Sequence, residues 1–474
     1  MTSFDLSALF DEHLPARLDL AERHFNPGLA QALRLLGLDR EYARAEGCYV
    51  YDAEGNRYLD MLCGYRVLNL GHNHPVVRRA VAEAMERCLP SMVQVEVSPL
   101  TALLARELSA RATPGLDVVR FGSSGSEAVE MAMKFARRAT GRPRLLAARH
   151  GYHGLTYGPL SLSGRPDLWQ EGFTPVLPAC DTVPFDDPEA LERALSSGDV
   201  AAFIVEPIQG EAGIVVPGDD YLPEAQRLCR RHGTLFVLDE IQTGLGRTGR
   251  FLAAEHWGLE PDMLCLAKAL SGGLVPVSAT LMRREIAMRV FGGVDCCAIH
   301  FSTFEGNTLA MAAGLATLHV LDSEGLVENS ARTGALLLDR LRELQQRHEC
   351  IAEVRGMGLF AAVRFSEPRS LGPRMAWKLT EETGEGFFAQ CVVMALLRDH
   401  RILAQTAGHD PDVLDCTPAL IAGEAEVDYF VRALDQVLAG CSDAVKLPAE
   451  MACAVMKQAL ALDVPLASLQ LSRA

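Results

Sequence analysis

The central part of the chain alternates short apolar runs with stretches of helical spacing. Residues 200–205, 235–238 and 263–267 are continuous apolar runs, which is typical of strands buried on both faces of a parallel sheet. Residues 223–232, which lie between two of these runs, have the spacing of a helix. Because strands and helices alternate in this way, the pattern predicts an α/β fold with a mostly parallel sheet.

Further predicted elements lie on both sides of this region. Residues 98–112 have the pattern of an amphipathic helix capped by Ser98, and a turn signal at 54–56 between alternating runs predicts a hairpin. Residues 1–47 have helical spacing, and from about residue 322 helices flank a strand-turn-strand unit. We therefore expect three parts: an N-terminal segment that joins a small domain (1–80), a large domain (81–324) and a C-terminal small domain (325–474).

Two of the apolar runs end in a charged residue. Asp239 follows the run 235–238, and Lys268 follows the run 263–267. Ligands of parallel sheets bind outside the carboxyl ends of the strands, so both side chains could project into one crevice. A salt bridge or simple solvation would also account for them. Alternatively, Lys268 forms a Schiff base and Asp239 keeps a ring nitrogen protonated, which are the two groups that pyridoxal phosphate requires.

A candidate phosphate site precedes these two residues in the chain. A predicted strand at 117–121 leads into the turn Gly-Ser-Ser-Gly-Ser at 122–126, and a helix follows. Free amide groups and the positive end of the helix dipole make such a turn a binding site for anions. The other interpretation is an ordinary helix cap at Ser124 or Ser126.

Three further motifs allow more than one interpretation. In His-Gly-Tyr-His-Gly at 150–154, Tyr152 could lie against a flat ligand or be half-buried in a glycine-rich turn. Residues 244–249 match the dinucleotide pattern GxGxxG, which leaves a nicotinamide-dependent oxidoreductase as a remote alternative, but no helix begins within the motif. His72 and His74 could form a metal pair, yet no third ligand lies at suitable spacing, so no metal is predicted.

Composition narrows the class of protein. The 474 residues are 49% hydrophobic and carry a formal net charge of −16, so neither nucleic acid nor an anionic membrane surface is an expected partner. No apolar run approaches the roughly 18 residues of a membrane span, and the N-terminus lacks the apolar core of a signal peptide. The 13 cysteines are odd in number and include no CxxC, which predicts reduced thiols in the cytoplasm.

Several motifs in a fixed order resemble the class III aminotransferases, which are pyridoxal-phosphate enzymes of fold type I. The motifs are FGSSGSEAVEMAMKFAR, HGYHG, VEPIQGEAG, FVLDEIQTGLGRTG, LCLAKALSGG and STFEGN. The likeness covers roughly residues 25 to 440 and is nearest to the branch of the putrescine and omega-amine aminotransferases. It implies an α/β fold in which a large domain holds a mostly parallel, seven-stranded sheet. Both termini would contribute to a smaller α/β domain.

The resemblance also implies roles for residues around the cofactor ring. Lys268 would bind the cofactor as a Schiff base and then move a proton between substrate and cofactor. Asp239 would pair with the pyridinium nitrogen. Tyr152 would stack on the ring with His153 beside it, and Gln242 would contact the ring oxygen.

Other residues would bind the cofactor, most of them through its phosphate. Gly125 and Ser126 would bind it from the helix turn, and Glu206, from the motif VEPIQGEAG, would belong to the cofactor site. Thr303 would reach the cofactor phosphate of the neighbouring subunit. The resemblance thus implies a homodimer whose active sites lie at the interface.

One departure from the family concerns the substrate. Family members commonly carry an arginine that binds a substrate carboxylate, within a segment like LRFxPPL, and Asp415 occupies that position here. An aspartate would repel a carboxylate. Tyr65 falls where relatives line the substrate pocket, and Glu211 matches an acid that often gates the arginine. Arg66 is a candidate replacement cation for the amino donor, the alternative being a surface or interface residue.

We therefore expect a cytoplasmic, homodimeric aminotransferase that moves an amino group between a donor and an aldehyde or ketone. Its substrate would be of the amine or omega type and would lack a carboxylate beside the reacting carbon. A mutase, a racemase or a decarboxylase on the same scaffold is the main alternative, and a non-enzymatic protein is a further one. The role of the segment after Gly440 stays open.

Overall fold

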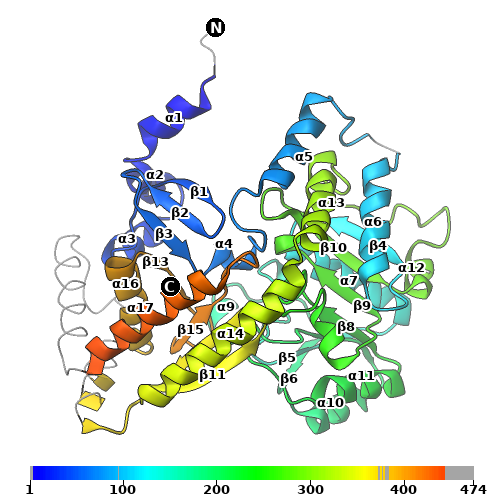
Figure 1. The fold of residues 1–474 in the computed structure, drawn as a ribbon. Helices are drawn as coiled ribbons and strands as arrows, with labels where there is room; N and C mark the ends of the chain where they lie inside the picture. Colours follow the sequence, from blue (N-terminus) through cyan, green and yellow to red (C-terminus); the bar gives the residue numbers. More distant parts are fainter. Residues whose placement is uncertain (1–3, 94–95, 372–373, 376, 379–383, 443–474) are drawn as a thin grey trace.

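A computed structural model describes residues 4–93, 96–371, 374–375, 377–378 and 384–442. Its largest unit is a seven-stranded sheet with the strand order β4-β10-β9-β8-β7-β5-β6 (Figure 1). Only β10 runs antiparallel to its neighbours. The strands are β4 (Val118–Gly122), β5 (Arg144–Ala148), β6 (Cys180–Val183), β7 (Val200–Val205), β8 (Leu235–Asp239), β9 (Met263–Leu266) and β10 (Ser278–Met282).

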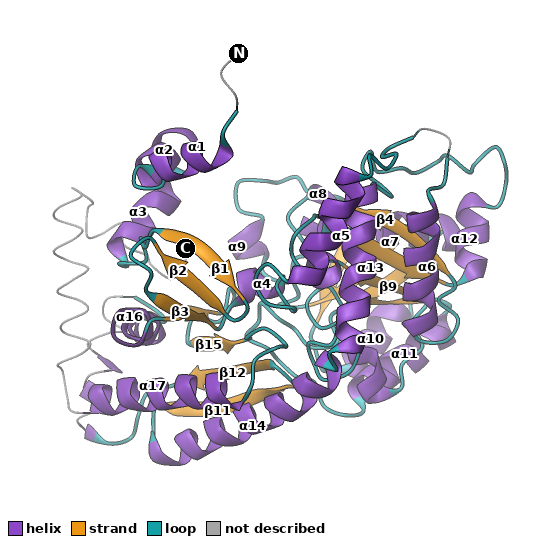
Figure 2. Cartoon of the chain, turned by 45° about the horizontal axis from the view of Figure 1, so that its top comes forward, coloured by secondary structure: helices purple, strands orange, loops and turns teal. Residues whose placement is uncertain are grey.

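Helices cover both faces of this sheet (Figure 2). The helices between residues 75 and 323 are α5 (Pro75–Glu86), α6 (Pro99–Arg111), α7 (Gly125–Thr140), α8 (Tyr157–Leu160), α9 (Pro166–Trp169), α10 (Pro188–Leu195), α11 (Tyr221–His232), α12 (Arg284–Phe291) and α13 (Thr308–Ser323), with the 3-10 helices η1 (Ala253–Trp257) and η2 (Lys268–Ser271). Along β7, Phe203 packs into the core with α6, α11 and α13, whereas Ile204 packs into the core with α7 and α12. Successive side chains of a strand point to opposite faces, so a sheet covered on both faces requires the continuous apolar runs seen in the sequence.

The strand register brings several polar residues to one edge of the sheet. Val205 pairs with Leu238, so the next residues, Glu206 and Asp239, end neighbouring strands. β9 lies beside β8 and ends two residues before Lys268. Because these strands are parallel, their carboxyl ends meet at the same edge, as the sequence predicted.

Elements from the two ends of the chain lie beside each other, away from the large sheet (Figure 1). In one four-stranded sheet the N-terminal strands β1, β2 and β3 pair with the C-terminal strand β13, and a second sheet has the order β11-β12-β15-β14. The N-terminal elements are α1 (Leu6–His13), α2 (Arg17–His24), α3 (Pro27–Leu35), β1 (Tyr42–Glu46), β2 (Tyr49–Asp52), β3 (Arg57–Asp60) and α4 (Cys63–Arg66). The C-terminal elements are α14 (Leu326–Arg347), β11 (Ile351–Met357), β12 (Phe360–Phe365), α16 (Phe387–His400), β13 (Ile402–Leu403), β14 (Gln405–Thr406), β15 (Val413–Cys416) and α17 (Glu424–Ser442).

The structure confirms most predicted elements and corrects one. Helices were expected through residue 47, but α3 ends at Leu35 and β1 follows, because residues 42–46 pair with the predicted hairpin. The boundaries of the three expected domains stay a prediction, and residues 443–474, which include most of the segment after Gly440, lie outside the described residues. Within the described part of the chain, no helix is both long and apolar enough to cross a membrane.

The structure accounts for the two motifs that could have indicated a dinucleotide site or a metal site. Residues 244–249 form a loop after β8 in which no helix begins, so the dinucleotide pattern lacks its required context. Nε2 of His72 lies 2.8 Å from Asp60, and Nε2 of His74 lies 3.2 Å from Glu324. The two imidazoles therefore contact different carboxylates.

Candidate active site

A cavity of about 170 Å³ lies at the carboxyl edge of the large sheet. It is built from the segments that follow β5, β7, β8 and β9, together with the first turn of α7. Eight of its lining residues were predicted from the sequence as site residues, and Gly154 and Ile241 were not. The lining residues are Gly125, Ser126, Tyr152, His153, Gly154, Glu206, Asp239, Ile241, Gln242 and Lys268.

Lys268 begins the short helix η2 directly after β9, with a left-handed backbone (φ 43°). Burial lowers the pKa of its amine to about 8, although the charges of Glu211 and Asp239 act in the opposite direction. A lysine with a lowered pKa holds a larger fraction of free amine near neutral pH. The amine is therefore prepared to act as a nucleophile and as a base.

Asp239 forms a buried pair with His153, whose Nδ1 lies 2.8 Å from Oδ2 of the carboxylate. Burial alone would lower the pKa of His153, but the hydrogen bond and charge of Asp239 raise it above its ordinary value. Oδ1 of Asp239 accepts the backbone N–H of Ile241 at 3.1 Å. These contacts fix the direction of the carboxylate.

Glu206 lies next to this pair and holds two backbone segments. It accepts the N–H of Tyr152 at 2.8 Å and the N–H of Gly210 at 3.0 Å. Burial raises the pKa of Glu206 to about 7, and the nearby charge of Asp239 acts in the same direction. Glu206 thereby positions the segment that carries the Tyr152 ring.

The first turn of α7 has the geometry of an anion site. Ser124 caps the helix by accepting the N–H of Glu127 at 3.2 Å, so the expected cap is present. Ser126 lies one step inside the helix and lines the cavity. At Gly154, a Cβ would overlap the Ser126 hydroxyl, so the glycine permits the loop after Tyr152 to approach the turn.

Arg66 lies at the centre of a buried polar cluster. Its guanidinium pairs with Asp415 and contacts Glu211 at 3.1 Å and Oε1 of Gln242 at 2.7 Å. Arg66 is 1% exposed, so the alternative of a surface residue is wrong. The expected free negative charge of Asp415 is instead compensated by Arg66.

The pKa values of the two carboxylates of this cluster are shifted in opposite directions, although burial acts to raise both. It raises the pKa of Asp415 to about 6, although the Arg66 charge acts to lower it. Burial also acts to raise the pKa of Glu211, but the charges of Arg66 and Lys268 outweigh it and hold the pKa below its usual value. Glu211 thus connects the Arg66 cluster electrostatically to Lys268.

Five predicted residues do not line this cavity: Arg66, Glu211 and Asp415 form the buried cluster described above, whereas Tyr65 and Thr303 are exposed. Tyr65 is 61% exposed and has a left-handed backbone within α4. Thr303 is exposed in the segment between α12 and α13. The side chains of Tyr65 and Thr303 therefore lie outside the cavity that Lys268 of the same chain lines.

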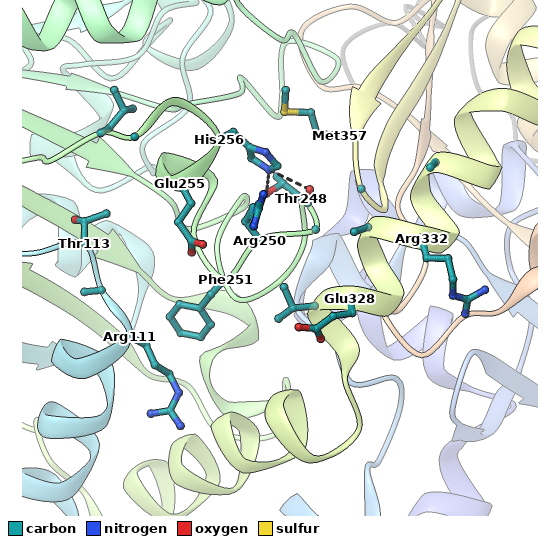
Figure 3. Close-up of a pocket in the computed structure, with 18 of the residues that line it drawn as sticks. Arg111, Thr113, Thr248, Arg250, Phe251, Glu255, His256, Glu328, Arg332 and Met357 are labelled. Carbon is teal, nitrogen blue, oxygen red and sulfur yellow. Dashed lines mark hydrogen bonds between the residues drawn. The ribbon is translucent and has the colours of Figure 1, made fainter.

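A larger hollow, of about 1260 Å³, lies elsewhere in the molecule (Figure 3). α6, the segment after β8 and α14 contribute to it, with Arg111, Phe251, Glu328 and Arg332 among its lining residues. It is lined by charges of both signs and by none of the residues predicted for the site. The predicted chemistry therefore belongs to the smaller cavity.

The residues of the smaller cavity fit pyridoxal phosphate. The first turn of α7 presents N–H groups that lack intrahelical partners, which suits a phosphate. Asp239 is a fixed carboxylate that suits a protonated ring nitrogen, and Lys268 is an amine suited to covalent attachment. His153 also lines the cavity, and its Nε2 atom is buried without a hydrogen-bond partner.

The chain also resembles proteins of known activity. A family model described as class-III aminotransferase matches residues 36–438. The chain is 35% identical to aminotransferase PigE of a Serratia species over 458 residues, which is 89% of this chain and 54% of PigE, so it spans about half the length of that relative. It is 39% identical to putrescine aminotransferase of Pectobacterium atrosepticum over 375 residues, covering 76% of this chain and 78% of that protein.

Solved structures share the fold. An ornithine aminotransferase from Toxoplasma gondii ME49 matches with a TM-score of 0.73 and 33% identity over 84% of this chain and 90% of its own. An amine transaminase from an uncultivated Pseudomonas species matches with a TM-score of 0.73 and 31% identity over 84% of this chain and 94% of its own. These matches confirm the predicted fold. Together with the family match over most of the chain, they show that this protein belongs to the class III aminotransferases, which depend on pyridoxal phosphate.

Proposed function

We propose that this aminotransferase acts on an amine, and on the corresponding aldehyde or ketone, without a carboxylate beside the reacting carbon. The observation that carries this proposal is the pairing of Arg66 with Asp415. Arg66 faces two carboxylates, Asp415 and Glu211, so the cluster offers no spare positive charge to a substrate carboxylate. A substrate whose amine is attached to an uncharged carbon chain does not need a positive charge at this position.

The residues of the cavity have distinct roles in the proposed reaction. Pyridoxal phosphate, when bound, supplies an electron sink for the bond that breaks at the amine-bearing carbon. Asp239, oriented by His153, would hold the proton on the ring nitrogen, and Tyr152 would orient the ring. Nζ of Lys268 would move a proton from the substrate carbon to the cofactor in the first half of the reaction and in the opposite direction in the second half.

The proposal is tested by measuring nitrogen transfer from a panel of amines to a panel of aldehydes, ketones and 2-oxo acids. We expect stoichiometric exchange between a separate donor and acceptor, with the parallel-line kinetics of a ping-pong reaction. Conversion of a single compound without an acceptor would favour the alternative of a mutase, racemase or decarboxylase. Preference for acceptors with a carboxylate beside the carbonyl would contradict the proposed substrate class.

Arg66→Ala should lower amino transfer from glutamate and from an amine without a carboxylate by the same factor, because the guanidinium is already paired with Asp415 and Glu211 and leaves no charge for a donor carboxylate. Removing the guanidinium alone leaves the buried Asp415 unpaired, which typically destabilises a protein by about 3–5 kcal/mol. The double variant R66A/D415N removes that charge and is therefore measured in parallel. A larger loss for glutamate than for the amine in both variants would show instead that Arg66 binds the donor carboxylate, while R66K serves as the charge-retaining control.

We also infer that the enzyme is a cytoplasmic homodimer. Exposed apolar side chains occur in segments that border the active site, including Tyr65, Tyr157, Phe301 and Phe304, which are 60–67% exposed. Clusters of such side chains favour a protein interface. Thr303 lies between two of them, and this position suits contact with a second copy of the chain.

The segment that carries Thr303 is anchored to its own phosphate turn. Oε2 of Glu127 accepts both the N–H of Ser123 at 2.6 Å and the hydroxyl of Ser302 at 3.1 Å. Arg120 pairs with Glu305 at 2.8 Å on the other side of Thr303. These bonds hold Thr303 in a defined position at the surface, which supports its proposed contact with the partner's cofactor phosphate.

Thr303→Ala should weaken retention of the cofactor several-fold without dissociating the dimer, because one hydroxyl contact to the phosphate is lost.

Phe301→Asp should instead favour the monomer, because a charge would be buried in the apolar interface. Light scattering reports the assembly, and absorbance of bound cofactor after dialysis reports retention. Monomeric wild-type protein that keeps its cofactor and activity would contradict the proposed arrangement.

A further inference from the structure

A hydrogen bond between Trp169 and His409 joins two segments that are far apart in the sequence. Nε1 of Trp169, at the end of α9, donates to Nε2 of His409 at 2.8 Å. An indole can only donate, so Nε2 of His409 carries no proton and its neutral ring is protonated at Nδ1. Nδ1 in turn donates to the carbonyl oxygen of His150 at 2.9 Å. These two bonds together determine the tautomer and the direction of the imidazole ring.

The loop that carries His409 also rests on Glu211. The N–H of His409 donates to the carbonyl oxygen of Glu211 at 2.8 Å. At Gly408, a Cβ would lie 2.7 Å from Oε2 of Glu211, so the backbone is packed against that carboxylate. Arg165 adds a further bond by donating to the His409 carbonyl oxygen at 3.0 Å. The loop between β14 and β15 is therefore held at the side of the active site where Glu211 acts on Lys268.

Trp169 does not line the cavity itself but contacts one of the residues that do. Its ring contacts the ring of Tyr152 edge to face, with centroids 5.7 Å apart and an interplanar angle of 66°. Tyr152 lines the cavity together with Lys268. Trp169 is only partly buried, so part of the indole is available for contact. The indole thus contacts both Tyr152, which is proposed to lie against the cofactor ring, and His409, which belongs to the loop packed against Glu211.

We propose that Trp169 is a specificity-determining residue and that His409 positions it. The inference rests on the proposed function, because it concerns the part of the amine or carbonyl substrate beyond the reacting carbon. Rotation of the indole would leave its N–H and the buried Nε2 of His409 without partners, which is unfavourable. Trp169 is therefore a stiff, flat, apolar wall. It admits linear chains and flat rings and excludes chains that branch near the amine.

The first experiment compares kcat/KM for a linear, an aryl-substituted and a branched primary amine with one common acceptor. In Trp169→Ala, we expect the ratio of branched to linear amine to rise at least tenfold, because the wall is removed. Trp169→Phe keeps a ring and should change the ratio less. An unchanged ratio, or an equal loss for all amines, would overturn the inference. A wild-type enzyme that transfers nitrogen from no amine would overturn the proposed function, and this inference with it.

The second experiment tests the positioning role of His409 with two variants. His409→Leu removes the acceptor, whereas His409→Gln can still accept from the indole. We expect His409→Leu to raise the branched-to-linear ratio and to shift the Trp169 emission, isolated as the difference from Trp169→Phe, to longer wavelength. His409→Gln should restore both readings, with cofactor absorbance and thermal midpoint recorded as controls. If His409→Leu retains the wild-type ratio and emission, His409 does not position the wall.

Discussion

Lys268→Ala should abolish amino transfer while the protein stays folded. The variant lacks the amine that we propose attaches the cofactor and moves the substrate proton, and proton transfer by a placed side chain alone contributes roughly 10²–10⁴-fold to a rate. Burial disfavours the charged amine of Lys268 and lowers its pKa to about 8, so its removal should not lower the thermal midpoint. Turnover and the absorbance band of the covalently attached cofactor are the two measurements.

A matched control separates the loss of this amine from the loss of any lysine. Lys378 has a side chain that is 59% exposed and lies outside the cavity, so Lys378→Ala should retain turnover and the absorbance band. Wild-type turnover in Lys268→Ala would overturn the assigned role. Loss of the folded state in that variant would show that Lys268 is needed for stability instead.

Asp239→Ala should reduce turnover by roughly 10²–10³-fold, the usual effect of removing one preorganised electrostatic contact at a reacting group. Without the carboxylate, the ring nitrogen of a bound cofactor would lose the group that we propose keeps it protonated, and the electron sink would weaken. His153 loses its partner at the same time, so the pKa of this buried imidazole should fall. Stopped-flow measurement of the first half-reaction and the pH dependence of the cofactor absorbance would report both changes.

Another Asp–His pair, far from the cavity, serves as the control. Asp435 contacts His348 at 2.6 Å between α17 and α14, away from the cavity. Asp435→Asn should therefore leave the half-reaction unchanged, even if the thermal midpoint falls. Equal rates in wild type and Asp239→Ala would contradict the assigned role of Asp239.

Much of the fold could be predicted because its signals are local. The continuous apolar runs of β7, β8 and β9 reflect burial on both faces, and that requirement is visible in each run by itself. The turn before α7 and the cap at Ser124 are likewise encoded within a few residues. Asp239 and Lys268 stood out because a polar residue ended each apolar run. Parallel strands then brought these ends together.

The sequence could not show which distant side chains meet. Arg66 and Asp415 are 349 residues apart, so the aspartate at the usual arginine position looked like an unpaired negative charge. Only the path of the chain brings a compensating guanidinium from α4 to β15. The N-terminal helices were also overestimated, because residues 42–46 form a strand through pairing with the hairpin.

The sequence by itself determined the class of fold, the strands of the large sheet and the charged residues at the carboxyl ends of its strands. Periodicity, caps and strand-end residues act over a few residues, so one segment is enough to read them. The tertiary structure decided how charge is balanced around Lys268, which predicted residues stay outside the cavity, and that Trp169 meets His409 across 240 positions. These outcomes depend on contacts between distant segments, whose partners are set only when the whole chain packs around the sheet.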